Sequence, residues 1–479
     1  MAGPLINFSG LASGIDSASL IEATSEAARI TKVIPHETKI SELEDTNTAL
    51  DDVKTMLDEL KDIIFEFSTL GGGIVEKSAD SSNEAVITAT ANNSATNGTY
   101  ELTVNTLAEN ATFSFDDSIS DPDAKITSAG GGPFTVTFTI GTTPPDPGET
   151  VSFNVTDDDT TYAGYVALFN ENSSLATASM INVGTTSLPD YRIVIVSNEV
   201  GTEKGTITLT NDGNITGDPL ADTAYSVDQA QNASFNIAGI STAFTRSSNT
   251  ITDVIQGVTF NLEDTGASIT VKVGDDVAST TANAQSFIDK YNEIVTYLSE
   301  NNLIIPEQNG DSFINIFGPL ASTRVDDSIL SAIRSGMVGA SYSSGTEVKI
   351  FADMGITTAR DGTLSLNGNT WTGAPTFEDA VSSESESVRQ IFLKFADTVS
   401  TTGGTIDQYT RFNGLIDSTI TGNDTLIDDL NDRIARAEAS ISAQEDMLRA
   451  RFARLESSIS KMQSQQSALT SALAGLSAS

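Results

Sequence analysis

The chain has 479 residues, more than a single hydrophobic core usually organises, so about two to four domains are expected. Its 25 basic and 65 acidic residues give a formal net charge of -40, which disfavours nucleic-acid binding because phosphates would be repelled. The absence of Cys excludes disulfides, zinc–thiolate sites and thiol catalysis, and no apolar run approaches the roughly 18 residues of a membrane span.

The first 36 residues begin as an apolar, glycine-punctuated stretch and then become helical. Asp16 or Ser17 can cap this helix, which carries Leu20 and Ile21. The stretch lacks the features of a signal peptide, because it has no positive n-region and two glycines interrupt its apolar part. Export from the cytoplasm would therefore need another route.

A second helix is predicted from about residue 37 to 68, after a break at Pro35 and before three glycines at 71–73. Its apolar side chains fall seven apart at Leu43, Leu50, Leu57 and Ile64, with companions at Val53, Leu60 and Phe67. This spacing is typical of a coiled-coil seam, and the core of an ordinary helical domain explains it equally well.

The C-terminal region is predicted to be one long helix. Apolar residues recur every seven positions, at Ile427, Ile434, Ile441, Leu448, Leu455, Met462, Leu469 and Leu476. The companion positions shift from three residues on (Leu430, Ala437) to four residues on (Phe452, Ile459, Leu473), which predicts a change of packing partner between Gln444 and Arg451. About fifty helical residues make a rod about 75 Å long, too long for burial in one globule, so packing between subunits is expected.

Between the helical ends the apolar period changes to two. Residues 85–108 predict a hairpin with Asn97-Gly98 at its turn and Tyr100, Leu102 and Val104 on one face, and further strands are expected in 232–239, 249–266 and 267–273. Residues 109–230 are rich in Asp, Thr, Gly and Pro, which indicates a separate all-β insertion. Helices return after Val277, followed by a hairpin in 353–367 with Asp361-Gly362 at its turn.

Few residues suggest chemistry. His36 is the single histidine, so neither a Ser-His-Asp triad nor a zinc set is expected. The glycine runs 71–73 and 130–132 lack phosphate-binding spacing. The carboxylates in 157–159 and 212–218 lack the ligand spacing of an EF-hand, so they are interpreted as turn residues. No catalytic residue, cofactor or metal is predicted.

Several motifs follow one another in a set order: residues 10–16 (GLASGID), 98–104 (GTYELTV), 233–239 (ASFNIAG), 257–262 (GVTFNL) and 451–465 (RFARLESSISKMQSQ). In order and spacing they resemble the flagellar filament cap (hook-associated protein 2) family. The resemblance covers both ends and the central core, but not 109–230. One departure is that the helix after Asp16 has mainly Arg29 and Lys32 where family members often carry a run of basic residues.

The resemblance implies a multidomain α+β fold. Residues 1–36 and 441–479 would form a terminal coiled-coil leg, 37–73 and 276–440 a helical core domain, 74–108 and 231–275 a β domain, and 109–230 a variable β tip. The residues expected to make the terminal contacts are Leu11, Gly14, Ile15, Asp16 and Leu20 in the opening segment, and Leu43, Leu50, Leu57, Ile64, Ile441, Leu448, Phe452, Leu455, Ile459, Met462 and Leu469 in the seam.

The resemblance also implies a structural role without enzyme activity. The protein would leave the cell through the flagellar type III export route, form a ring-like homo-oligomer at the distal tip of the flagellum, and help exported flagellin to fold and insert. Flagellin, hook–filament junction proteins and a cytoplasmic export chaperone would be its partners. Two alternatives remain open at this point: a tip adhesin that binds host or environmental glycans, and a glycan-active enzyme within 109–230.

Overall fold

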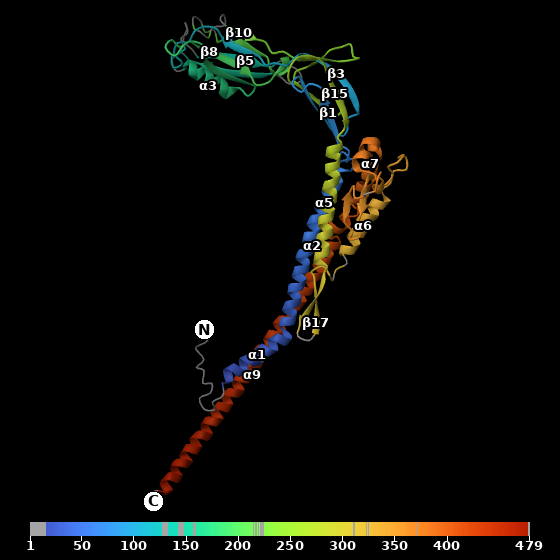
Figure 1. Ribbon diagram of the computed structural model, residues 1–479. Helices are drawn as coiled ribbons and strands as arrows, with labels where there is room; N and C mark the ends of the chain where they lie inside the picture. Colours follow the sequence, from blue (N-terminus) through green and yellow to red (C-terminus); the bar gives the residue numbers. More distant parts are fainter. Residues whose placement is uncertain are drawn as a thin grey trace. The chain divides into compact units, whose positions relative to one another are not determined.

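The computed structural model describes residues 16–126, 133–141, 148–156, 160–213, 215, 218, 220, 225–309, 312–321, 323, 325–369 and 371–477. The chain divides into a helical unit, Met1–Ile74 with Thr281–Ser479, and a β unit, Val75–Thr280 (Figure 1). The prediction of a mixed helix-and-sheet protein with helical ends and a β-rich middle is confirmed.

The helical unit is built on long helices. They are α1 (Ser17–Lys32), α2 (Ile34–Glu66), most of α5 (Val277–Asn301), α6 (Val325–Gly339), α7 (Phe377–Val399), α8 (Asp407–Thr410) and α9 (Leu415–Ser477), with the short 3-10 helix η1 (Phe351–Met354). Two small hairpins complete it: β16 (Ile304–Asn309) with β17 (Ser312–Phe317), and β18 (Ile356–Thr358) with β19 (Leu364–Leu366). The second hairpin is the one predicted in 353–367, whereas the first was not predicted.

Helix α2 runs from Ile34 to Glu66, about three residues before the predicted start at 37 and about two residues before the predicted end at 68. Pro35 occupies its first turn, where a missing N–H costs nothing. Gly72 and Gly73, after its end, have positive φ angles of 102° and 89°, and a Cβ on Gly71 would collide with the backbone of Phe65 and Glu66. The glycine run therefore lets the chain turn tightly back against the end of the helix.

An aromatic cluster holds α2, α5 and α7 together. The ring of Phe67 meets that of Phe392 edge-on, with centroids 5.3 Å apart and planes at 84°. Phe287 packs against both Phe67, at 6.3 Å, and Phe395, at 5.5 Å. Edge-to-face pairs of this kind add about 0.5–1.5 kcal/mol each beyond the burial of their area, so this cluster anchors the end of α2.

The β unit contains two hydrophobic cores. The first lies within a five-stranded sheet, in the order β1-β15-β3-β11-β12, and a three-stranded sheet, β13-β14-β2. The bounds are β1 Lys77–Ser81, β2 Ile87–Ala91, β3 Gly98–Thr106, β11 Ala233–Ile237, β12 Phe244–Arg246, β13 Thr250–Ile251, β14 Val258–Leu262 and β15 Gly266–Asp275. All the described pairings in these sheets are antiparallel.

The predicted hairpin in 85–108 is wrong, although both of its strands exist. β2 pairs with β14, and β3 pairs with β11 and β15, so the two strands belong to different sheets. Asn92 starts a local turn by accepting a hydrogen bond from Ser94 N at 3.0 Å, and its own N–H donates to Gly257 O. The Asn97-Gly98 signal was therefore overridden by pairing with strands far along the chain.

The second core of the β unit is formed by residues between 111 and 230. Its sheets run β10-β4-β8-β7 and β6-β5-β9. The bounds are β4 Thr112–Phe115, β5 Phe134–Ile140, β6 Glu149–Val155, β7 Ala176–Asn182, β8 Tyr191–Ser197, β9 Ile207–Asn211 and β10 Tyr225–Asp228, with the helices α3 (Tyr162–Asn172) and α4 (Gly201–Lys204).

Helix α3 contradicts the prediction that this insertion is all-β. Thr161 caps the helix by accepting a hydrogen bond from Gly164 N at 3.0 Å. Tyr162, Tyr165 and Phe169 fall at helical spacing and are buried, so they fix the helix against the sheets. Only three buried side chains mark the helical period here, and the neighbouring segments form strands, so the sequence pattern did not indicate this helix.

Candidate functional site

The candidate site is the antiparallel contact of α1 with α9 and the free length of α9 beyond it (Figure 1). Asp16 is the N-cap of α1: its Oδ1 accepts a hydrogen bond from Ser19 N at 3.1 Å, and its Oδ2 accepts one from Ser19 Oγ at 2.7 Å. These hydrogen bonds, the one from the Ser19 hydroxyl first, lower the pKa of the Asp16 carboxyl. The cap fixes the start of the helix at Ser17.

One face of α1 is buried in the helical unit. Ile21 is 6% exposed and Ile441 on α9 is also 6% exposed. Beside them Arg29 donates to Glu438 of α9 at 2.8 Å, and it also lies 3.4 Å from Glu37 of α2. Helices α1 and α9 therefore meet within one copy.

The four seam residues of α2, Leu43, Leu50, Leu57 and Ile64, are all buried. They pack inside the helical unit, and α2 lies along α9 through hydrogen bonds such as Asn47 Nδ2 to Asp424 Oδ1, at 2.8 Å. The structure thus uses this stripe as intramolecular core, which was one of the two interpretations left open by the sequence.

The stripe of α9 changes character after Ile441. Leu448, Phe452 and Ile459 are half-buried, while Leu455, Met462 and Leu469 are 44%, 60% and 63% exposed. In the part of α9 whose side chains are described, none beyond Ile441 is classed as buried. The apolar side chains of α9 thus become exposed close to residues 444–451, where the sequence predicts a change of packing partner. We call this exposed stripe the distal stripe of α9, from Leu448 to Leu473.

Of the five residues expected in the opening segment, Leu11, Gly14 and Ile15 lie outside the described residues. Asp16 has the capping position given above. Leu20 is 50% exposed, so it points away from the buried face that carries Ile21. The helical stripe of α1 is too short for the sequence to have separated these two neighbours.

The distal stripe differs from the rest of the chain in charge. Arg449, Arg451, Arg454 and Lys461 lie between residues 447 and 477, where Glu456 is the single acidic residue of the sequence. The chain as a whole carries -40. An apolar helix face bordered by cations is suited to contact an apolar surface that carries carboxylates.

His36 and Asp218 each make hydrogen bonds within the fold. His36 lies in the first turn of α2, where its backbone N–H donates to Val33 O at 2.9 Å. Asp218 is buried and accepts hydrogen bonds from Tyr162 Oη and Leu220 N, and burial, aided by this carboxylate, raises the pKa of Tyr162. The runs 130–132 and 157–159 and Asn214 lie outside the described residues.

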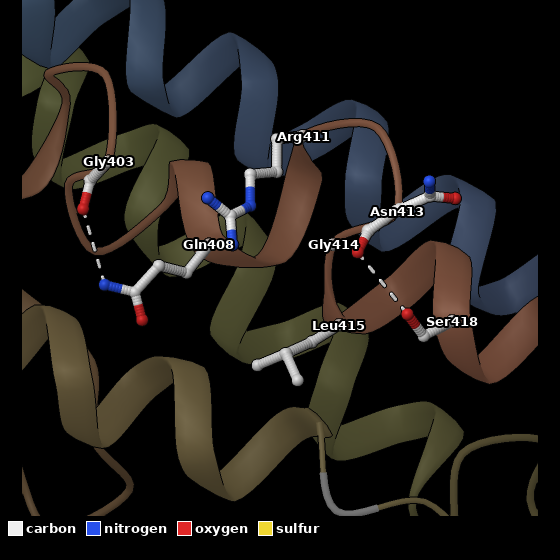
Figure 2. A pocket seen from close by; sticks show the side chains of 7 residues that line it. All are labelled: Gly403, Gln408, Arg411, Asn413, Gly414, Leu415 and Ser418. Carbon is white, nitrogen blue, oxygen red and sulfur yellow. Dashed lines mark hydrogen bonds between the residues drawn. The ribbon is translucent and has the colours of Figure 1, made fainter.

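A shallow pocket of about 360 Å³ lies at the turn between α8 and α9 (Figure 2). Arg411 is among the residues that line it. Two long hydrogen bonds of 3.4 Å join other lining residues, from Gln408 Nε2 to Gly403 O and from Ser418 Oγ to Asn413 O.

Within the described ranges no three His, Asp or Glu side chains are grouped to hold a metal ion. No helix among the described residues has the length and apolarity that a membrane crossing requires.

Comparisons with known proteins give one consistent family. The model described as flagellar hook-associated protein 2 N-terminus matches residues 13–111, and the one described as flagellar hook-associated protein 2 C-terminus matches 230–464. The A-type flagellar hook-associated protein 2 of Pseudomonas aeruginosa is 32% identical over 393 residues, 75% of this chain and 76% of that protein. The B-type protein is 25% identical over 420 residues, 84% and 83% of the two chains.

A similar fold has been solved. The D1-D2-D3 domains of the flagellar cap protein FliD from Escherichia coli match with a TM-score of 0.58 and 20% identity, over 78% of this chain and 99% of that one. At this identity the likeness concerns the fold alone. Residues 112–229 lie outside both family matches.

Proposed function

Because the chain belongs to the flagellar hook-associated protein 2 family, a structural family of flagellar cap proteins, we propose that it caps the growing filament as an oligomer. In this role it would promote the folding and insertion of exported flagellin at the distal tip. Its residues 1–36 and 441–479 would form the leg that contacts the filament or a neighbouring copy.

The distal stripe of α9 is the observation that carries this proposal. Leu455, Met462, Leu469 and Leu473 are 44–63% exposed along one helix. Covering one such side chain gives roughly 1.5–3 kcal/mol, and contiguous exposed apolar surface marks interaction sites. A stripe left open in a single copy is suited to a protein that works by assembling with other chains.

Export through the flagellar type III route is part of the same proposal. A chain without Cys can pass through a channel unfolded without forming disulfides outside the cell. A cytoplasmic chaperone would cover the apolar ends before export, and flagellin and the hook–filament junction proteins would be neighbours afterwards. The alternative of a glycan-binding tip adhesin gains no support from the family matches and is not proposed.

Electron microscopy of a strain that lacks the chain tests the function. We expect short or absent filaments and flagellin released into the medium, with filament growth restored by the intact gene. Filaments of normal length in the deletion strain, together with lost binding to mucin, would overturn the capping role and favour an adhesin.

A further inference from the structure

The hairpin of β16 and β17 is an exposed apolar element of the helical unit. No other strand in the described residues joins it. Its register pairs Ile304 with Phe317 and Ile305 with Ile316, so that apolar side chains lie on both faces. These four side chains are 53%, 59%, 55% and 48% exposed.

Such a hairpin needs a partner. A two-stranded hairpin is marginally stable by itself in water, and strands that are apolar on both faces are usually covered on both. Between residues 300 and 320 the sequence has acidic residues and no Lys or Arg, and Glu307 lies within β16. The surface to be covered is therefore apolar and bordered by negative charge.

The distal stripe of α9 has the complementary chemistry. Its exposed side chains are Leu and Met, and its border carries Arg451, Arg454 and Lys461. In a chain with a net charge of -40, this is a short stretch with a local excess of cations. Complementary charges of this kind select partners and set their orientation.

Within one copy the two surfaces are too far apart to meet. The base of the hairpin is tied to α2, because Thr46 Oγ1 donates to Pro319 O at 2.9 Å, and the adjacent Asn47 donates to Asp424 of α9 at 2.8 Å. At about 1.5 Å per residue, Leu455 lies about 45 Å further along α9 than Asp424. A strand of six residues reaches about 20 Å.

From these relations we infer that the β16–β17 hairpin of one copy binds the distal stripe of α9 of a second copy. The contact joins two different surfaces, so it is head-to-tail, and it gives a ring where the rotation that relates neighbouring copies closes. The inference rests on the proposed function, because it assigns a contact between neighbouring copies of the cap.

Disulfide trapping between copies tests the contact, because the native chain contains no Cys. Two full-length single-cysteine proteins, Ile305→Cys and Met462→Cys, are mixed under assembly conditions and oxidised. We expect the mixture to give at least about 10-fold more dimer-sized product than either protein alone (about 1.4 kcal/mol of preference per factor of ten). Ile316→Cys, on the same face as Ile305, should behave in the same way.

Ser464→Cys is the matched control, because it lies two residues from Met462 and so about 200° around the helix. It should not trap with Ile305→Cys. Equal trapping of both α9 positions, or dominant trapping of Ile305→Cys with itself, would overturn the inference.

The Ile305→Cys and Met462→Cys proteins are produced together in the deletion strain. Filament length and disulfide trapping at the filament tips are then measured. Restored filaments without trapping at their tips would reject the hairpin contact while leaving the capping function intact. Normal filaments in the deletion strain itself would reject the function, whatever the trapping result.

Discussion

Arg29 of α1 and Glu438 of α9 form an ion pair with an N–O distance of 2.8 Å, although they lie 409 positions apart in the chain. Their side chains are 39% and 47% exposed, so the pair itself contributes little to stability. Its importance is positional: Arg29 lies in the last turn of α1, so in this antiparallel contact the pair marks the end of the contact nearest α2, and the first turn of α1 lies toward the distal stripe. Ile21 on α1 and Ile441 on α9 are both buried, while none of the described side chains of α9 beyond Ile441 is buried.

The buried stripe of α2 should dominate the stability of the helical unit. Leu57 is 0% exposed, and Leu57→Ala removes buried methyl groups and leaves a cavity. We expect a loss of about 2–5 kcal/mol in the free energy of unfolding, measured with urea. Leu70→Ala is the control, because Leu70 is 86% exposed. Its effect should stay within about 0.5 kcal/mol. Equal losses would mean that this stripe is not core.

Acid should weaken the contact of α2 with α8 and α9. Lys54 Nζ lies 2.5 Å from Asp417 Oδ1, and Lys61 Nζ lies 2.9 Å from Asp407 Oδ1. Hydrogen bonds from these lysines lower the pKa of both carboxyls below the ordinary value of 3.8. The folded-state pKa is thus below the unfolded one, so the stabilisation is present above the ordinary pKa and is lost as the pH falls through the lowered value.

The test of this pH dependence is Lys54→Met. It should lower the free energy of unfolding near neutral pH, and its difference from the native chain should shrink steadily below pH of about 4, where Asp in the unfolded chain begins to protonate. Lys39→Met removes an exposed pair with Glu42 and should change little at either pH. A Lys54→Met difference that grows in acid would contradict the assignment.

The insertion should be removable without unfolding the remainder. Its ends are adjacent, because Glu109 N donates to Gln231 O at 2.9 Å and Gln231 N donates to Glu109 O at 3.2 Å. Its core consists of residues between 111 and 230, and the other core of the β unit has its own residues. Replacing 110–230 by a short Gly-Ser linker should therefore preserve the other sheets, as measured by circular dichroism. An unfolded product would refute this boundary.

The sequence predicted the helical parts better than the sheets, because a helix is fixed by neighbours along the chain. The heptad spacing of Leu43 to Ile64 and of Ile427 to Leu469 requires only local periodicity, and both helices are present. The partners of β2 and β3 lie more than a hundred residues away. Nothing in the local Asn97-Gly98 signal reports on them, so the hairpin prediction failed.

For the candidate site, the heptad periodicity could be read from the sequence, but the exposure of the side chains could not. Leu43 and Leu455 occupy equivalent heptad positions, yet Leu43 is 8% exposed and Leu455 is 44% exposed. Burial depends on which helix lies alongside, and α1 covers only the first part of the stripe. The β16–β17 hairpin was missed for a related reason, because its run LIIP lacks the alternation that marks a half-buried strand.

Association between copies should strengthen with salt. Each chain carries a net charge of -40, which repels its neighbours across a symmetric assembly. Near 0.15 M salt the Debye length is about 8 Å, and exposed charges further apart than this are screened. Sedimentation at low and high salt should show larger particles at high salt. Larger particles at low salt would indicate that specific ion pairs outweigh the general repulsion.

The distal stripe should be needed for filament growth and not for folding of a single copy. Leu455 is 44% exposed, so Leu455→Asp buries nothing unfavourable in the free chain and should leave its thermal unfolding unchanged. In an assembly the same carboxylate would lie unpaired against apolar side chains, which costs several kcal/mol. We therefore expect a deletion strain supplied with Leu455→Asp to form short filaments or none, as measured by electron microscopy.

Ser464→Asp controls for the added charge, because Ser464 lies off the stripe on the same helix and should restore filaments of normal length. Removal of residues 1–36 should act like Leu455→Asp, since it takes away the whole of α1, which packs along α9 and pairs with it through Arg29 and Glu438. Full-length filaments with both Leu455→Asp and the truncated chain would mean that neither end of the chain docks, and the exposed stripe would then have no role in assembly. Loss with the truncation alone would assign docking to the α1 side of the contact.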